Sequence, residues 1–560
     1  MALTLNKDIR LDLSTVSSSA GAGPSWHNHP IVRAVGGSVL VQEHNEIRYD
    51  TPTLQLYRSR VALTLNRRGE QWIQRCSVEE GAEQDKKWLE TPVPDQQLDL
   101  KMMRKMPAFP PLNANDARAL APVFTLHCRE QKCSLSLPGG LSIILKEEQG
   151  YIKWGATRQS FHELVFEYHA GDLARWFQTV LELAYWLFLQ EKGGDEKNGP
   201  LEKGGPGLVG ATPVTRGFAW LDPALLMPVV RTTPEGKSDG PPEEGMPEIL
   251  LPKGASERTA QQTFVALCAG LLQAMQADQT TVLYGGKQAR LAGVRLFHQA
   301  TGRLHTLVGW YQPVLPAAIY TELDREISWL LKELVLVQEC QMLLKETLEP
   351  LTEQFATHPG LEELLQKTKN GLIHALKRLE KSLTSFRYTR LILGLESWIT
   401  GSQWEFLSDH AQRETLALPM ARLAADWLQQ CHAPLRKRGR QWTGLDGAAR
   451  GAFYHEMEHM LYTTDLFADL FAGKRTESGG RTRPAGGRNA FQDSLSRVHS
   501  VVQVLVHLQT GHRLLTRGVN AKEGGANHPI QVWQEARMAR CLADATQEWE
   551  LFSTKLSFWH

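Results

Sequence analysis

The chain has 560 residues, of which 42% are hydrophobic and 22% charged, and its formal net charge is +1 at pH 7. This length exceeds what one ordinary hydrophobic core serves, so we expect two or more domains. A net charge near zero gives no global attraction to nucleic acid or to an anionic membrane, and we predict neither partner. The seven scattered cysteines predict free thiols and a cytoplasmic location rather than a disulfide framework.

The first 190 residues contain short β-type runs bounded by Gly, Pro, Asn or charged residues. Pro138-Gly139-Gly140 predicts a hairpin turn. The spacing of apolar residues then becomes helical over 172–190, with Asp172 as the expected N-cap. The predicted strands cover 39–41, 54–57, 61–66, 72–77 and 141–145.

Two stretches rich in Gly, Pro, Lys and Glu interrupt this pattern, a loose insertion at 192–210 and a linker at 231–255. We therefore predict one domain over 1–230 and a second over 256–560. The second domain repeats apolar residues every three or four positions, which predicts an antiparallel helix bundle. Its expected helices include 321–343, opened by a capping box at Thr321–Asp324, then 372–386, 453–471 and 495–515, with a loose loop at 474–488.

Several short motifs occur in an order that resembles the CYTH–CHAD architecture, especially the bacterial inorganic triphosphatases of the triphosphate tunnel metalloenzyme superfamily. The resemblance implies an α+β fold, with an N-terminal antiparallel β-barrel followed by an all-α antiparallel helix bundle. The motifs are Tyr49-Asp50-Thr51-Pro52, Pro122-Val123-Phe124, Glu163 and Glu167 with Gly171-Asp172, Arg216-Gly217-Phe218, and Leu383–Tyr388 followed by Trp398.

The resemblance also implies a chemistry. A triphosphate needs basic side chains for its oxygens, and carboxylates that hold Mg²⁺ or Mn²⁺ beside an attacking water. The candidate metal ligands are Glu163, Glu167 and Asp8. The candidate phosphate-binding residues are Arg129, Lys132, Arg10 and Arg216. No catalytic residue is assigned.

The chain departs from the family pattern at several charged positions. The family's Arg-x-Arg falls on Thr64 and Asn66, and Val165 occupies the middle of the alternating-Glu strand. Arg10 and Asp12 have the opposite sign to the family's Glu-x-Glu-x-Lys. Because losing one charge-stabilising group costs about a hundredfold or more in rate, we predict a catalytically weakened protein that binds a phosphate-rich ligand or a protein partner. The alternative is an active metal-dependent enzyme that cleaves inorganic triphosphate to pyrophosphate and phosphate.

CHAD domains carry histidines on their helices, which with nearby Arg and Lys bind polyphosphate. The corresponding helices fall on 295–311 and 451–467. In the second of these, Tyr454, Glu458 and Leu461 occupy the expected basic positions. The resemblance therefore implies inorganic triphosphate or polyphosphate as ligand, through a weakened basic pattern.

Two other features have competing interpretations. His455-Glu456-x-x-His459 matches the zinc metallopeptidase helix, for which Asp465, Asp469 or Glu477 would supply a third ligand. The packing pattern of a bundle helix explains the same residues, and we favour that interpretation. The basic runs at 436–440 and 474–488 could hold phosphates or RNA, but without interleaved aromatic residues we interpret them as solvated segments.

Overall fold

The computed structural model describes most of the chain. The described residues are 8–14, 26–78, 87–99, 118–191, 206–210, 212–221, 258–355, 359–401, 408–471, 486–518 and 528–559. The predicted linker at 231–255 and most of the insertion and loop predicted at 192–210 and 474–488 lie outside these ranges.

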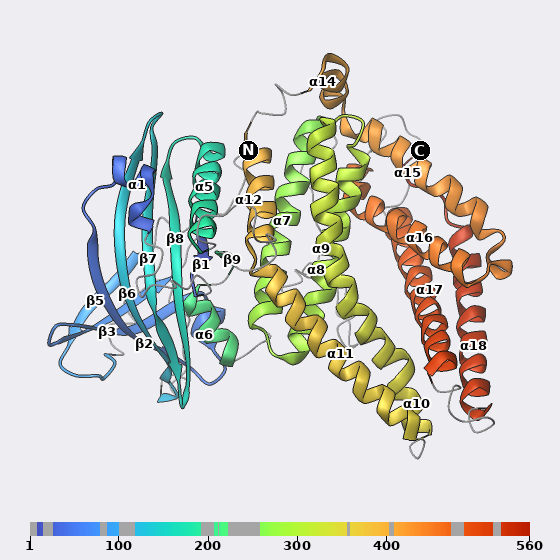
Figure 1. Cartoon of the computed structure of the whole chain (residues 1–560), viewed down its shortest axis with the longest axis horizontal. Helices are drawn as coiled ribbons and strands as arrows, with labels where there is room; N and C mark the ends of the chain where they lie inside the picture. Colours follow the sequence, from blue (N-terminus) through green and yellow to red (C-terminus); the bar gives the residue numbers. More distant parts are fainter. Residues whose placement is uncertain are drawn as a thin grey trace.

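The N-terminal half is one antiparallel sheet of nine described strands, in the order β5-β4-β3-β2-β6-β7-β8-β1-β9 (Figure 1). β6, β7 and β8 are its longest strands. The strands are β1 Asp8–Asp12, β2 Leu40–Asp50, β3 Val61–Arg68, β4 Gln71–Val78, β5 Lys87–Val93, β6 Ala121–Leu137, β7 Leu141–Trp154, β8 Thr157–Ala170 and β9 Gly207–Val209.

The predicted closed barrel is wrong, because among the described residues the two edge strands β5 and β9 do not pair with each other. Side chains of the helical half bind the outer edge of β9 instead. The backbone N–H of Leu208 donates to Thr389 Oγ1 over 2.9 Å, and Gln279 Nε2 donates to the Leu208 carbonyl over 2.8 Å. Since these helices satisfy the edge groups, the sheet ends here without closing on itself.

Local predictions in this half have mixed outcomes. The β6–β7 hairpin is confirmed, and its turn places Gly139 and Gly140 at φ of 82° and 80°. The predicted strand at 54–57 is wrong: α2 Gln55–Arg58 is a short helix there. The reason is the carboxylate of Asp50, which accepts the backbone N–H groups of Leu56 and Tyr57, each over 2.9 Å.

The predicted helix at 172–190 is confirmed as α5 Leu173–Glu191. Asp172 Oδ1 accepts the backbone N–H of Arg175 over 2.7 Å, as an N-cap does. The other described helices of this half are short: η1 Trp26–Asn28, α1 Pro30–Val35 and α6 Pro213–Leu221.

The C-terminal half is helical, as predicted (Figure 1). Its helices are α7 Ala260–Tyr284, α8 Lys287–Trp310, α9 Ala317–Leu343, η5 Leu344–Leu348, α10 Glu349–Gln354, α11 Pro359–Leu383, α12 Phe386–Thr400, α14 His410–Ala417, α15 Met420–Gly439, η6 Trp442–Gly444, α16 Gly447–Phe467, η7 Ala468–Phe471, α17 Gly486–Gly518 and α18 His528–Ser553.

Two helix boundaries differ from the predictions. α9 begins at Ala317 rather than at a capping box, and the Thr321 hydroxyl donates to the Ala317 carbonyl inside the helix. The predicted helix at 372–386 spans two helices, because Ser385 ends one turn and caps the next. Its Oγ accepts the backbone N–H of Tyr388 over 3.3 Å.

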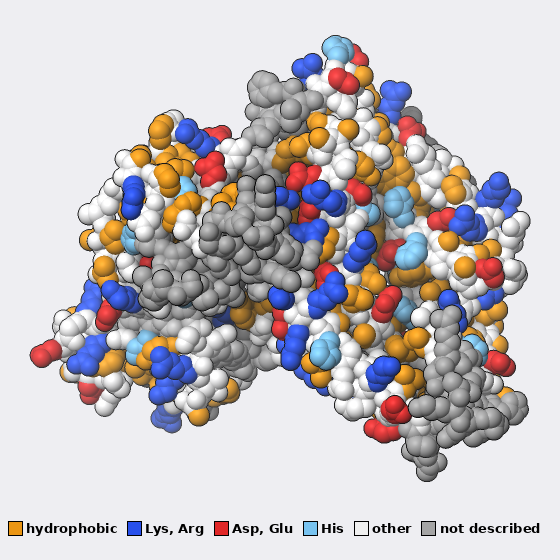
Figure 2. Space-filling model, viewed as in Figure 1, with side chains coloured by type: hydrophobic (Ala, Val, Ile, Leu, Met, Phe, Trp, Pro, Cys, Tyr) orange, Lys and Arg blue, Asp and Glu red, His pale blue; other side chains and the backbone are white. Residues whose placement is uncertain are grey.

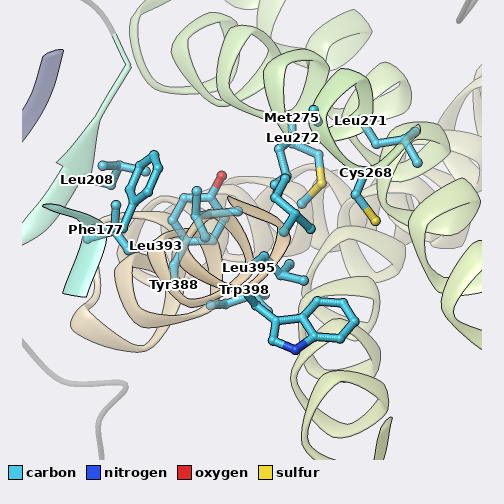
Figure 3. Packing of buried hydrophobic residues seen from close by; sticks show 14 of the residues in the cluster. Phe177, Leu208, Cys268, Leu271, Leu272, Met275, Tyr388, Leu393, Leu395 and Trp398 are labelled. Carbon is cyan, nitrogen blue, oxygen red and sulfur yellow. The ribbon is translucent and has the colours of Figure 1, made fainter. Parts of the chain in front are cut away.

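α5 joins the two halves. It lies between the sheet and α12 (Figure 1), and its buried residues belong to one hydrophobic cluster that extends from the sheet into the helices. Phe177 of α5 and Leu208 of β9 lie on the same side of the cluster as Tyr388 and Leu393 of α12 (Figure 3). A separate cluster, which includes Phe453, fills the space among α15, α16, α17 and α18.

Four carboxyl groups are buried among the described residues of the helical half, and Glu396 and Asp278 are the most deeply buried of them. Glu396 of α12 is 2% exposed and accepts a hydrogen bond from Gln276 Nε2 over 3.0 Å. Asp278 of α7 is also 2% exposed. Burial raises the pKa of each of these two groups to about 8, so both carry a proton at neutral pH.

Two predictions from composition can be compared with the structure. All seven cysteines are free, as expected. Among the described helices, none combines the length and apolarity that crossing a bilayer requires. The cytoplasmic location stays a prediction.

Candidate functional site

One face of the sheet carries most of the predicted site residues, on β6, β7, β8 and β1. Side chains opposite one another on neighbouring strands share a face, so the register groups them into cross-strand rows. We call this surface the polar face. Its three rows are Lys132–Lys146–Val165–Arg10, then Glu130–Glu148–Glu163–Asp12, and then Ile144–Glu167–Asp8.

Arg10 lies in the middle of the polar face and is paired with two carboxylates. Its Nη1 is 2.7 Å from Glu148 Oε2 and 3.2 Å from Glu163 Oε2. Burial alone would lower the pKa of Arg10, but these two carboxylates outweigh it and raise the pKa. This guanidinium is therefore already bound within the sheet and is not presented to a phosphate.

Glu163 has a second basic partner from outside the sheet. Arg216 of α6 donates to its other oxygen, and Glu163 and Arg216 are 1% and 5% exposed. Burial raises the pKa of Glu163, while Arg216 and Arg10 act in the opposite direction. A predicted phosphate-binding residue thus neutralises a predicted metal ligand.

α6 lies against one end of the polar face. Phe218 of α6 contacts Phe124 of β6, with ring centroids 5.1 Å apart, and stacks on Tyr57 at 4.0 Å. Together with Phe161 and Ile152 these side chains form a closed apolar cluster. This end of the face is therefore filled by protein.

One further ion pair on the polar face joins a basic residue to a predicted metal ligand. Lys146 of β7 donates to Glu167 of β8. Burial alone would lower the pKa of Lys146, but the hydrogen bond and charge of Glu167 outweigh it and raise the pKa. Asp8 lies opposite Glu167, and Lys132 lies opposite Lys146.

Arg129 is the one predicted phosphate-binding residue that the register places away from the polar face. It is exposed and lies opposite Glu43 and Gln149, whose side chains project to the other side of the sheet. Because Arg129 and Lys132 are three positions apart on one strand, their side chains project to opposite faces of the sheet.

The predicted metal ligands do not fit Mg²⁺ or Mn²⁺ as they are arranged. Glu163 is held by two guanidinium groups and Glu167 by an ammonium group. Hard divalent cations need carboxylate oxygens that are free to coordinate them. Among the described residues, no group of three His, Cys, Asp or Glu side chains is placed to hold a metal ion.

Sequence reasoning missed three members of the site. The predicted strand at 141–145 was too short, whereas β7 continues to Trp154 and brings Glu148 beside Arg10. Continuing the alternation of side chains along the strand from Lys146 would have identified Glu148. The same reasoning applied to β6 would have identified Glu130. Tyr284 of α7 lies 5.3 Å from the Arg216 guanidinium. No sequence signal links it to a sheet residue so far away in the chain.

The His-Glu-x-x-His match does not form a common site. His455 Nδ1 is 3.5 Å from Glu458 Oε2, whereas His459 Nδ1 is 3.3 Å from Cys431 Sγ. Glu456, the expected water-activating residue, is 2.6 Å from Arg438 Nη1. Each residue has a different partner, so the geometry favours the bundle-helix interpretation.

A different surface of the helical half keeps a positive excess. Lys and Arg side chains gather near the centre of the view in Figure 2, over α9, α11 and α12. We call this the α9–α12 basic surface; its acidic members are Glu322, Asp324, Glu326, Glu333 and Glu380. Its basic members are Arg325, Lys332, Lys377, Arg378, Lys381, Arg387 and Arg390.

Ion pairs anchor the arginines of this surface without cancelling its charge. Arg378 Nε is 2.6 Å from Glu333 Oε2, and Arg387 Nε is 2.6 Å from Glu326 Oε2. The Arg387 guanidinium also lies 4.2 Å from the ring centre of Trp329. Seven basic groups against five carboxylates leave a local excess of positive charge, and Lys377 and Lys381 are exposed.

The family model for the CHAD domain matches residues 266–503. This part of the chain is a CHAD domain. It spans most of α7, then α8 to α16 and the first part of α17, and includes the α9–α12 basic surface. No curated protein matches the sequence.

Solved structures also match parts of the chain. The crystal structure of the CHAD domain from the plant Ricinus communis is 19% identical, covers 53% of this chain and 93% of its own, and has a TM-score of 0.41. A Hippeastrum protein described as an adenylyl cyclase with a dominant triphosphatase activity is 16% identical, with coverages of 33% and 87% and a TM-score of 0.18. An adenylate cyclase from Bacillus halodurans is 12% identical, with coverages of 29% and 79% and a TM-score of 0.16.

Proposed function

We propose that the chain is a CYTH–CHAD protein that binds a phosphate-rich anion without cleaving it. The sheet half is a scaffold, and the CHAD domain binds the anion at the α9–α12 basic surface. The observation that carries the proposal is the pairing of Glu163 with both Arg10 and Arg216. The basic groups that would hold a phosphate neutralise a carboxylate that would hold a metal.

Electrostatics support this division. Four basic side chains lie at the polar face: Arg10, Lys132 and Lys146 on its strands and Arg216 on α6. They stand against six carboxylates on the four strands, so the summed charge is negative and opposes entry of a polyanion. The six carboxylates are Asp8, Asp12, Glu130, Glu148, Glu163 and Glu167. The α9–α12 basic surface has the opposite excess, which suits an anion carrying several phosphates.

One observation favours retained triphosphatase activity as a second candidate. Lys132, Lys146 and Arg10 form a basic row with carboxylates on both sides of it, and this is the set of groups that metal-dependent phosphate cleavage uses. The enzyme would need a divalent cation to displace the ammonium group from Glu167 and the guanidinium groups from Glu163.

A phosphate-release assay with inorganic triphosphate and Mg²⁺ or Mn²⁺ separates the two candidates. We expect turnover well below about 1 s⁻¹, because the metal ligands are already neutralised. Turnover above that rate, abolished in Glu163→Ala, would establish the enzyme instead. Activity that persists in this variant indicates a contaminating phosphatase, and the preparation is then repeated until the wild-type rate can be assigned.

Binding is tested separately with long-chain polyphosphate by calorimetry. We expect the double variant Lys377→Glu/Lys381→Glu to bind at least about tenfold more weakly, with the loss greatest at low salt. The matched control, Lys345→Glu/Lys437→Glu, makes the same change in net charge at exposed positions away from this surface. Equal losses in both double variants would show a net-charge effect and contradict the assignment of the surface.

A further inference from the structure

A cluster of ionisable side chains lies where α8, α16 and α17 meet, apart from the polar face and the α9–α12 basic surface. Glu458 of α16 accepts hydrogen bonds from the hydroxyls of Tyr462, over 3.2 Å, and Tyr454, over 3.4 Å. Its second oxygen is 3.5 Å from His455 Nδ1. Figure 2 shows histidine side chains on this part of the surface, over the region of α8 and α16.

Two further histidines approach Glu458 from the neighbouring helices. His298 of α8 and His499 of α17 are half-buried, and both lie within the electrostatic field of Glu458. The His499 ring stacks on Tyr454, with centroids 4.9 Å apart and planes at 25°. His499 Nε2 is buried and has no hydrogen-bond partner among the described residues. His455 therefore contacts the carboxylate of Glu458, while the charges of His298 and His499 act on it from α8 and α17.

The cluster lies at the boundary of two hydrophobic cores. α16 contributes to both: Phe453 and Met457 belong to the core of α15 to α18, whereas Leu466 and Phe467 belong to the cluster that joins the sheet and the first helices, to which α8 also contributes. The ionisable groups of the cluster therefore accompany apolar packing between α16 and its neighbours, and a change in their charge acts on that packing.

The other charged groups near the crossing have partners of their own or keep a fixed charge. Arg303 of α8 is 2.8 Å from Asp465 of α16, and it also acts on Asp278 of α7. On α17, Arg497 is 3.3 Å from Glu548 of α18. Arg295 precedes His298 by about one turn of α8 and stays charged across the physiological range. Within the cluster itself only the histidines change charge between pH 5 and 8, whereas Asp278, with its pKa of about 8, changes charge at the upper end of this range.

We propose that this histidine–glutamate cluster is a proton-sensitive joint, in which protonation below about pH 6 loosens the packing of α8 against α16 and α17. His455 is 74% exposed and adjacent to Glu458, so it takes the first proton without strain. Further protons must enter His298 or His499, where each imidazolium is half-buried and repels the others.

The pKa shift of each group gives the direction in which stability changes with pH. Burial lowers the pKa of His298 and of His499, so their contribution to stability is present above their ordinary pKa and is lost as the pH falls. Burial alone would raise the pKa of Glu458, but His455, His298 and His499 outweigh it and lower the pKa, so this contribution is also lost in acid. The hydrogen bond with Glu458 raises the pKa of His455, which alone opposes the trend.

Hydrogen–deuterium exchange of the full chain at pH 7.5 and 5.5, corrected for intrinsic exchange rates, tests the joint. We expect exchange in α8, α16 and α17 to rise by about fivefold or more at pH 5.5, while α5 and α12 change little. The double variant His298→Gln/His499→Gln should lose this rise. The control His410→Gln, at an 82% exposed position on α14, should keep it.

Two results would overturn the proposal. One is a rise in exchange that persists in the double variant or is uniform along the chain. The other is measured on the wild type and so does not depend on whether the variant folds. It is a histidine NMR titration in which the pKa values of His298 and His499 are found at or above that of His410.

Discussion

The polar face and the α9–α12 basic surface use similar side chains in opposite ways. On the polar face, Arg10 and Arg216 both bind the buried carboxylate of Glu163. On the helical surface, Arg378 binds Glu333 but remains 64% exposed. The same residue type is thus committed to internal pairing in one region and keeps its charge toward solvent in the other.

The difference shows why a list of basic residues does not identify a phosphate site. A buried guanidinium is held in place by its carboxylate partners, and releasing it to a ligand would leave buried charges unpaired. An exposed guanidinium can exchange partners at little cost. Burial and pairing therefore decide which half can meet a polyanion.

The largest effect is expected from breaking the buried pair on the polar face. Arg216→Ala leaves Glu163, at 1% exposure, without one of its two cations, and should lower the free energy of unfolding by about 3–5 kcal/mol. Urea unfolding measures it. Replacing both partners, as Arg216→Met with Glu163→Leu, should cost much less, because no unpaired charge remains. Equal losses of stability in the single and the double variant would show that packing, rather than an unpaired charge, causes the effect.

A smaller effect, of opposite sign, is expected in the helical core. Glu396 holds its proton up to about pH 8, whereas the unfolded chain releases it near the ordinary pKa of a glutamate. Its burial therefore costs stability increasingly as the pH rises from about 4.5 to 8. Glu396→Gln should stabilise the protein on the order of 2–4 kcal/mol at pH 8, and negligibly at pH 4.5.

Thermal or urea unfolding of both proteins across this pH range measures the difference. Asp278, also at a pKa of about 8, leaves a residual fall in the free energy of unfolding of the variant as the pH rises. If Glu396→Gln destabilised the protein at pH 8 as strongly as at pH 4.5, the buried glutamate would be ionised and paired.

The smallest effect is expected where the two regions meet. A Cβ on Gly207 of β9 would lie 2.4 Å from the Thr384 carbonyl oxygen, so Gly207→Ala should cost about 1–3 kcal/mol by pushing the sheet edge away from the helices. Gly394→Ala is the matched control, because nothing lies within 4 Å of its added Cβ in α12. We expect the control to be neutral or slightly stabilising.

The sequence predicted elements whose signals are local. The hairpin at Pro138-Gly139-Gly140 and the cap at Asp172 depend on residues a few positions apart, and both occur as predicted. Asp50 shows where such reasoning fails. Its carboxylate binds backbone groups six and seven residues ahead, so an apolar run that suits a strand is a helix.

The candidate site was predicted in part. Alternation along β1 and β8 correctly grouped Asp8, Arg10, Glu163 and Glu167 on one face. The pairing that neutralises them was beyond a sequence pattern, because it depends on where α6 and α7 bring Arg216 and Tyr284. The prediction of a closed barrel failed for a related reason, since the hydrogen bonds that end the sheet come from Gln279 and Thr389 in the helical half.

The placement of α5 limits how the protein can be divided. One side of this helix covers the sheet and the other packs on α12, so a fragment ending near residue 255 would expose a row of large apolar side chains to water. Such a fragment should self-associate. Deletion of either half in a genome would then give an insoluble remnant, which favours inheritance of both halves as a single unit.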